Sequence, residues 1–151
     1  MLERRDFEGL IPHAGTMCLL ERVLEWDTNR ILAATTTHRA HANPLRLAQH
    51  LHAVHLCEYG AQTMAIHGGL IARAAGSRAQ PGMLVSLRDV ELYCDDLDDL
   101  PGELHIEAHS LLVSESSWQY RFEARHGRTL LGSGRAAIIA RAPFSSSSAP
   151  G

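Results

Sequence analysis

A carboxylate interrupts the apolar face of a long helix that the sequence predicts. Apolar residues recur on this face every three or four positions, namely Leu47, Leu51, Val54, Ala61 and Ala65. Glu58 occupies the same face. Burying an ionised carboxylate without a partner is costly, so this side chain should find a hydrogen bond or take up a proton. Either outcome suits a general acid or a general base.

A structural explanation of Glu58 is also open. An ion pair with Arg39 or Arg46 would satisfy the carboxylate and only hold the helix in place. Gln62 lies one helical turn after Glu58 and adds a second polar group to the same face. Two polar residues at this spacing favour a polar cluster in an otherwise apolar groove.

Histidines are numerous, and five of the ten lie between residues 38 and 55. A metal-binding helix usually presents ligands at positions i and i+4, and no histidine pair on the predicted helix has that spacing. His52 and His55 are three residues apart and could share a face. We therefore expect no metal site and assign these histidines to polar positions on the helix flank. The three cysteines form no CxxC motif, which argues against a zinc ribbon or a disulfide framework.

The elements around Glu58 follow from the spacing of apolar residues. The helix is predicted over about residues 47–73, with Gly76 as its C-cap and a possible bend at Gly68–Gly69. A hairpin precedes it, with arms at residues 17–26 and 30–37, although the first arm by itself could also be helical. Four β-strands follow the helix, at residues 83–93, 102–114, 117–125 and 129–140.

This order predicts an α+β domain in which a curved antiparallel sheet of five to six strands wraps one long central helix. A single domain over residues 1–142 accounts for nearly the whole chain, and the Ser-rich tail at residues 143–151 is expected to be disordered. The sequence has neither alternating β-α-β units nor a glycine-rich phosphate loop, which excludes a nucleotide-binding domain.

Charge and hydropathy exclude two further classes. All 14 basic residues are arginines, and they are scattered along a chain whose net charge is −3, so the basic patch of a nucleic-acid binder is missing. No apolar run approaches the roughly 20 residues that span a bilayer. The N-terminal residues lack the apolar core of a secretory signal. We expect a cytoplasmic protein that binds neither nucleic acid nor membrane.

Four segments, in order, resemble the FabZ-type 3-hydroxyacyl-ACP dehydratases. FEGLIPHAGTMCLLERV resembles their LPHR…FLLVDRV opening, and EYGAQ at Glu58–Gln62 resembles their EAxAQ. PGEL at residues 101–104 and HGRTLLGSGRAAI at residues 126–138 resemble their PGDxL and DGKxVAEAEL segments. The likeness covers about residues 7 to 140. EYGAQTMAIHGG and NPLR resemble in particular the divergent ApeP-like branch, which is associated with aryl polyene pigment clusters.

The resemblance implies a hotdog fold and a dimer with a tunnel at the subunit interface. The tunnel would hold an acyl chain on the phosphopantetheine arm of acyl carrier protein, with no other cofactor bound. The implied reaction removes water from a 3-hydroxyacyl thioester and gives the trans-2-enoyl thioester, as in fatty-acid or polyene biosynthesis. Members of the ApeP-like branch act beside a second dehydratase subunit, so the implied dimer is either a homodimer or a heterodimer.

The resemblance also assigns roles to residues. Glu58 matches the family's catalytic glutamate, which helps the 3-hydroxyl to leave while a histidine of the other subunit removes the C2 proton. That histidine lies fourteen positions before the glutamate, where this chain has Pro44. His38 and His41 lie on the same predicted loop and are the candidates for the base, with His38 preferred because it ends a strand. The residues expected at the substrate-binding site are Gln62, Pro44 and Arg46.

Docking of the acidic carrier protein would need arginines near the mouth of the tunnel. The candidates by position are Arg39, Arg46, Arg78 and Arg88. The acidic loop at residues 95–99 should face away from such a partner.

Two other functions stay open on the sequence. A non-catalytic hotdog subunit could complete the tunnel of an active partner, which would explain the missing histidine. A hotdog acyl thioesterase would share the fold and the thioester substrate but hydrolyse it, and the fold does not separate the two reactions.

Overall fold

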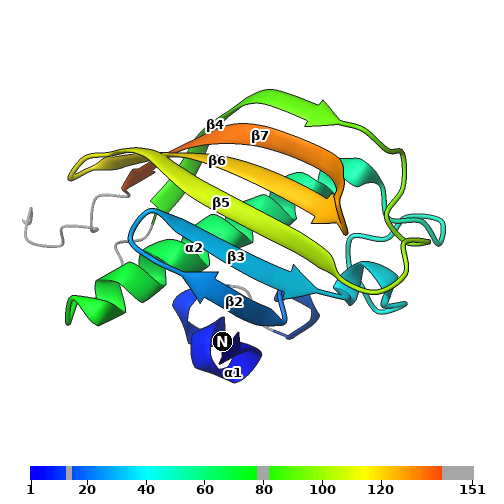
Figure 1. Ribbon diagram of the computed structural model, residues 1–151, viewed down its shortest axis with the longest axis horizontal. Helices are drawn as coiled ribbons and strands as arrows, with labels where there is room; N and C mark the ends of the chain where they lie inside the picture. The colour runs from blue at the N-terminus through cyan, green and yellow to red at the C-terminus, as the bar shows by residue number, and fades with distance from the viewer. Residues whose placement is uncertain (13–14, 78–81, 141–151) are drawn as a thin grey trace, which may run out of the picture.

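One long helix packed against a curved antiparallel sheet makes up the fold (Figure 1). The computed structural model describes residues 1–12, 15–77 and 82–140. The predicted tail at residues 143–151, and Arg78, lie outside these described residues. Among the described residues, none of the helices is long and apolar enough to cross a membrane.

The sheet has seven strands in the described part of the chain, in the order β1-β2-β3-β5-β6-β7-β4. All neighbouring strands pair antiparallel. The strands are β1 (Leu2–Glu3), β2 (Arg22–Trp26), β3 (Arg30–Thr35), β4 (Gly82–Leu92), β5 (Leu104–Val113), β6 (Ser117–His126) and β7 (Thr129–Ala140). The prediction of an α+β domain is therefore confirmed, with a strand count slightly higher than the five to six expected. The two-residue strand β1 is too short to give a sequence pattern.

Helix α2 (Leu56–Ala74) begins nine residues later than the sequence predicts, so the predicted start at Leu47 is wrong. Ala48 and Gln49 have positive φ angles of 51° and 68°. Around them, Leu47 and His50 exchange two backbone hydrogen bonds of 2.8 and 2.9 Å. Positive φ at both central residues is typical of a tight two-residue turn. A right-handed helix needs negative φ angles, so it cannot include these two residues. One turn of 3₁₀ helix, η4 (Ala53–His55), then leads directly into α2.

The buried face of α2 also differs from the predicted stripe. Leu47 and Val54 are 67% and 54% exposed, and Ala65 is exposed as well. The residues of α2 that are buried form a different set, namely Leu56, Tyr59, Gly60, Gln62, Thr63, Met64, Ile66, His67, Gly69 and Leu70. A Cβ atom at Gly60 would lie 2.7 Å from the Phe122 ring. The small residue permits this close approach, and so it helps to determine which face is buried.

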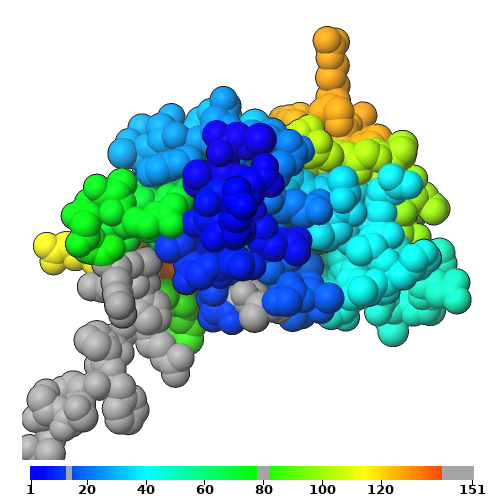
Figure 2. Space-filling model, turned by 90° about the horizontal axis from the view of Figure 1, so that it is seen from below, coloured from blue at the N-terminus to red at the C-terminus, as the bar shows by residue number. Residues whose placement is uncertain are grey.

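The predicted weak point at Gly68–Gly69 does not end the helix, which continues to Ala74. Short N-terminal elements, α1 (Arg4–Phe7) and η1 (Glu8–Leu10), pack against α2. The Arg73 side chain donates a 2.8 Å hydrogen bond to the Asp6 carbonyl, which ties the end of α2 to this segment. Figure 2 shows the molecule from below the view of Figure 1. The N-terminal segment, in blue, lies across the middle of the face seen there, between the green residues of α2 and the cyan loops.

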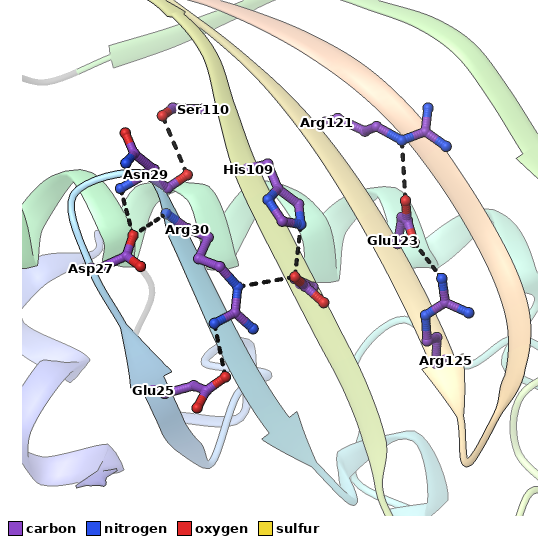
Figure 3. A network of polar contacts seen from close by, with 10 residues as sticks. Glu25, Asp27, Asn29, Arg30, His109, Ser110, Arg121, Glu123 and Arg125 are labelled. Atoms are coloured by element: carbon purple, nitrogen blue, oxygen red, sulfur yellow. Dashed lines mark hydrogen bonds and ion pairs between the residues drawn. The ribbon is translucent and has the colours of Figure 1, made fainter.

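The face of the sheet that is turned away from α2 carries charged side chains in pairs (Figure 3). Arg30 donates to Glu25 at 2.8 Å and to Glu107 at 3.1 Å. Glu123 lies between Arg121 and Arg125, at 3.2 and 2.5 Å. Exposed pairs of this kind stabilise a fold by about 0–1 kcal/mol each. This face of the sheet is therefore largely solvated.

Strand β4 ends the sheet and carries many exposed apolar side chains. Its only neighbour among the described residues is β7. The apolar residues of β4 with large exposed fractions are Met83, Leu84, Val85, Leu87, Val90 and Leu92. A long exposed apolar edge strand is a ready site for pairing with another chain.

Candidate active site

Glu58 lies in the first turn of α2 and is half-buried. The positive end of the helix dipole is at this turn, where a negative charge is stabilised. Gln62 lies one turn further along α2, and its Nε2 donates a 3.1 Å hydrogen bond to Oε1 of Glu58. The polar pair expected from the sequence is therefore present, although it lies at the border of the buried face.

The amide of Gln62 connects Glu58 to the segment that precedes β2. Its Oε1 accepts a 2.9 Å hydrogen bond from the Leu19 amide, and its Nε2 donates a 2.7 Å bond to the Met17 carbonyl. With the bond to Glu58, both protons and the oxygen of the amide are used. Only 1% of Gln62 is exposed. A buried amide satisfied in this way fixes the side chain and, through it, one oxygen of the Glu58 carboxylate.

A second group of polar residues surrounds the carbonyl oxygen of Leu19, whose amide bonds to Gln62. Thr35 and Thr37 donate their hydroxyl protons to this carbonyl, at 2.6 and 2.7 Å. The Tyr59 hydroxyl lies 2.8 Å from the Thr37 hydroxyl and accepts a 3.1 Å bond from Asn43. Burial raises the pKa of Tyr59, while these two neighbours lower it. The backbone at Leu19 thus joins Glu58 and Gln62 to a buried polar network.

A hollow of about 200 Å³ opens beside this network. The N-terminal segment and the loop after β3 line it, with Arg4, Thr16, Cys18, Glu21, Thr37, Ala40, Ala42 and Asn43. Thr37 and Asn43 therefore belong to the hydrogen-bond network and also line the hollow.

His38 is fully buried in the short helix η3 (Thr37–Arg39). Its Nε2 donates a 2.8 Å hydrogen bond to the Leu100 carbonyl, because a carbonyl oxygen can only accept. This bond leaves Nδ1 as the unprotonated nitrogen, and Nδ1 has no hydrogen-bond partner within the described residues. Burial lowers the pKa of His38, against the opposing effect of the Leu100 bond, so the neutral form is favoured.

The other residues predicted for the site lie on the loop that leads from η3 toward α2. His41 and Pro44 are exposed, and Arg46 is half-buried. Arg46 donates to the carbonyls of Gln49 and His38, at 3.1 and 3.4 Å. The loop is thus tied to the backbone of His38 through Arg46. The structure brings Glu58 and Gln62 into direct contact and groups His38 with Arg46.

His55 is a residue that the sequence analysis considered only for metal binding. It lies immediately before α2, three residues ahead of Glu58. Burial lowers its pKa, and the charge on His52 adds to this effect, while the charge on Glu58 opposes it. The i, i+3 spacing to Glu58 is the signal in the sequence that could have indicated that the charge of Glu58 acts on His55.

Comparisons with known proteins found one family model and several similar solved structures. A family model described as ApeP-like, ApeP dehydratase, matches residues 5–147. No protein with a curated function matches the sequence significantly. The dehydratase heterocomplex ApeI:P from Xenorhabdus doucetiae is similar in structure, with a TM-score of 0.81 and 23% identity over 90% of this chain and 91% of that chain.

Two further solved structures share the fold at lower similarity. A hypothetical thioesterase with coenzyme A from Streptococcus pneumoniae has a TM-score of 0.62 and 10% identity, covering 94% of this chain and 99% of that chain. AziG from S. sahachiroi has a TM-score of 0.59 and 17% identity, covering 87% and 97%. At these identities the likeness establishes the shared fold.

Proposed function

This chain belongs to the ApeP-like dehydratase family and has the hotdog fold, and from this premise we propose that it dehydrates 3-hydroxyacyl thioesters carried by acyl carrier protein. The observation that carries the proposal is the Glu58 carboxylate, held by the fully satisfied amide of Gln62 on the helix side of the sheet. In the proposed reaction a base removes the C2 proton, the C2–C3 double bond forms, and the 3-hydroxyl leaves as water with a proton from Glu58.

His38 is the proposed base, with His41 as the second candidate. A general base must be unprotonated, and two features of His38 support this state. Its Nε2–H is engaged by the Leu100 carbonyl, which directs the lone pair to Nδ1, and burial lowers its pKa. Substrate can reach Nδ1 only when the surrounding loop moves, because this atom is enclosed by protein.

The substitution Glu58→Gln tests the proposal. With purified chain, its dimer partner and a 3-hydroxyacyl-ACP, we expect the rate of enoyl formation to fall by about 10²–10⁴-fold, the usual contribution of a general acid or base. The matched control is Glu123→Gln, which removes a carboxylate on the solvated outer face, between Arg121 and Arg125. Unchanged turnover in the Glu58 variant would contradict the proposed role.

The base is tested in the same assay. If His38 is the base, we expect His38→Gln to abolish turnover although Glu58 is intact. If the exposed His41 is the base, His41→Gln should abolish turnover and His38→Gln should not. If both variants remain active and Glu58→Gln does not, the base belongs to the partner subunit.

A second hotdog subunit is the proposed partner. The exposed apolar edge of β4 supports this proposal, and so do two exposed apolar residues, Val54 in η4 and Ala65 in α2. Covering both surfaces would remove apolar area from water. The similar structure from Xenorhabdus doucetiae is itself a heterocomplex of two dehydratases, which favours a heterodimer over a homodimer. Arg39 and Arg88 are exposed and stay the candidates for carrier-protein docking.

A thioesterase is the second candidate function, since a thioesterase with coenzyme A shares the fold. Product analysis separates the two reactions. Dehydration yields an enoyl thioester with the thiol still acylated, whereas hydrolysis yields a free acid and a free thiol. The fixed ring of His38 fits a third reading, a non-catalytic subunit, and that reading requires Glu58→Gln to leave the activity of the complex unchanged.

A further inference from the structure

The loop ahead of α2 and the loop after β4 are held side by side by their backbones. The Leu97 amide donates to the Leu51 carbonyl, and the Ala53 amide donates to the Asp95 carbonyl, both at 2.8 Å. His52 and Asp96 lie opposite each other as an isolated bridge between these hydrogen bonds. The turn at residues 47–50 places His50 at the start of this short ladder. The side chains of residues 50–52 and 96–98 therefore meet in a fixed register.

An imidazole and two carboxylates converge at this ladder. One ligand atom each of His50, Asp96 and Asp98 lies within 4.8 Å of the others. His50 Nδ1 is 3.4 Å from Asp98 Oδ2 and 3.9 Å from Asp96 Oδ2. Ligand atoms in a tetrahedral zinc site are about 3.3–3.6 Å apart, because each bond is about 2.0–2.2 Å long. The three atoms could reach such a site through small side-chain movements.

Each carboxylate is oriented by a second contact. Asp98 Oδ1 accepts a 3.0 Å hydrogen bond from the Leu51 amide, which turns Oδ2 toward His50. Asp96 Oδ1 is 2.8 Å from His52 Nδ1, which leaves Oδ2 on the side of His50. Supporting contacts of this kind hold metal ligands in place. They distinguish the cluster from an exposed group of acidic side chains.

The charge of the cluster suits a divalent cation. The side chain of Asp98 is only 8% exposed. One oxygen of its carboxylate accepts the Leu51 amide, and the other faces His50. Asp96 supplies a second carboxylate. Arg46 is the nearby cation, and its guanidinium donates to the Gln49 and His38 carbonyls.

We propose that His50, Asp96 and Asp98 form a binding site for a divalent transition-metal ion, with zinc as the representative. A nitrogen ligand together with two carboxylates favours such ions over Mg²⁺ and Ca²⁺, which prefer oxygen alone. Three protein ligands leave a position for water. The ion would fasten residues 47–53 to residues 95–98, immediately before the helix that carries Glu58. It would stabilise the fold and take no part in the reaction.

The sequence predicts no metal site, because no histidine pair on the predicted helix has the i, i+4 spacing. The proposed ligands come from two loops that are far apart in sequence. The backbone hydrogen bonds that join these loops leave no recognisable pattern in the sequence of either loop.

Zinc titration of chelator-treated protein without a histidine tag tests the site. We expect one Zn²⁺ per chain by calorimetry, and Co²⁺ to bind with the visible absorption of a low-coordinate site. His50→Asn and Asp98→Asn should each weaken Zn²⁺ binding at least about tenfold. Asn at position 98 keeps an acceptor for the Leu51 amide, so this loop should stay folded. The control is His109→Asn, which removes a histidine 2.7 Å from Glu107 on the outer face.

Two further readouts complete the test. Zn²⁺ should raise the melting temperature of the wild type and of the His109 variant, and leave that of the His50 variant unchanged. Equal Zn²⁺ affinity in all four proteins would overturn the proposal, and so would Mg²⁺ binding as tightly as Zn²⁺. Neither readout depends on dehydratase activity, so the metal site and the proposed function fail or succeed separately.

Discussion

The side-chain amide of Gln62 makes three hydrogen bonds at once, to Met17, Leu19 and Glu58. The sequence analysis could predict Glu58 and Gln62 as a pair, because their i, i+4 spacing fixes their relative position on any helix. It could not predict Met17 and Leu19 as partners, because backbone groups carry no sequence signal. The contact between Glu58 and Gln62 was therefore predictable from the sequence, whereas the backbone groups that hold Gln62 were not.

Replacing Gln62 with Met should destabilise the protein by about 1–3 kcal/mol, since the Leu19 amide and the Met17 carbonyl each lose a buried partner. Turnover should fall as well, because Glu58 loses a donor. Denaturant unfolding and the dehydration assay measure the two effects. Thr63→Val is the control, since among the described residues the Thr63 hydroxyl bonds to the Tyr59 carbonyl of its own helix alone. A free energy of unfolding equal to that of wild type would contradict the role of Gln62.

The buried ring of His67 should make stability depend on pH. Its Nε2 donates to the Asp27 carbonyl at 2.7 Å, and its Nδ1 accepts from the Tyr120 hydroxyl at 2.8 Å. Burial lowers the pKa of His67 despite the bond to Asp27, and raises the pKa of Tyr120 to about 12. Both groups are therefore neutral in the folded protein.

The neutral state of folded His67 determines whether the free energy of unfolding rises or falls with pH. Below the unfolded histidine pKa of about 6.5, the unfolded chain takes up a proton that folded His67 does not. The free energy of unfolding should thus be greatest above about pH 6.5 and decrease as the pH falls toward the folded pKa, by at most about 1.4 kcal/mol per pH unit for this histidine. Urea unfolding of wild type and His67→Gln across this range measures the effect. An equal pH slope in the two proteins would refute it.

At the scale of elements, α2 shows what periodicity can and cannot determine. The predicted end near Arg73 is close to the observed Ala74, because a glycine is a recognisable sign of a helix end. Ala75 is the C-cap, and Gly76 follows it with a φ of 73°. The predicted start is wrong, because Ala48 and Gln49 are residues for which a left-handed turn is uncommon. The face is wrong because apolar periodicity gives no weight to Gly60, whose lack of a side chain admits Phe122.

The glycines of α2 offer a matched pair of substitutions. Gly60→Ala should destabilise the protein by about 1–3 kcal/mol, because the new Cβ would lie 2.7 Å from the buried Phe122 ring. Gly68→Ala should stabilise it by about 0.5–1 kcal/mol, because a Cβ there has no heavy atom within 4 Å and alanine favours helix. Thermal or chemical unfolding distinguishes the two. Equal effects at both positions would show that helix propensity, and not packing, governs α2.

At the scale of the whole molecule, the sequence predicts the order of elements well, because strands β4 to β7 each carry a clear apolar pattern bounded by turn residues. It does not predict that β4 is the last strand of the sheet, since strand order depends on contacts between segments that are distant in sequence. The exposed apolar edge is a property of that order.

Leu87→Lys on β4 should weaken dimer formation at least about tenfold, because it places a charge on the apolar surface proposed for the second subunit. Sedimentation or light scattering of the chain, with and without a co-expressed partner, measures the change. The control is Thr129→Lys, which adds the same charge at an exposed position where β7 begins. Dimers of equal stability in both variants would exclude the β4 edge as the interface.

The exposed edge of β4 should also affect how much of the protein accumulates in the cell. A chain made in excess of its partner would keep this apolar strand open, and such strands attract chaperones, proteases and other nascent chains. Surplus copies should therefore be degraded or aggregate, and the amount of partner should set the amount of protein that persists. We expect production of the chain by itself to give mostly insoluble material, and synthesis of both subunits together to give soluble complex.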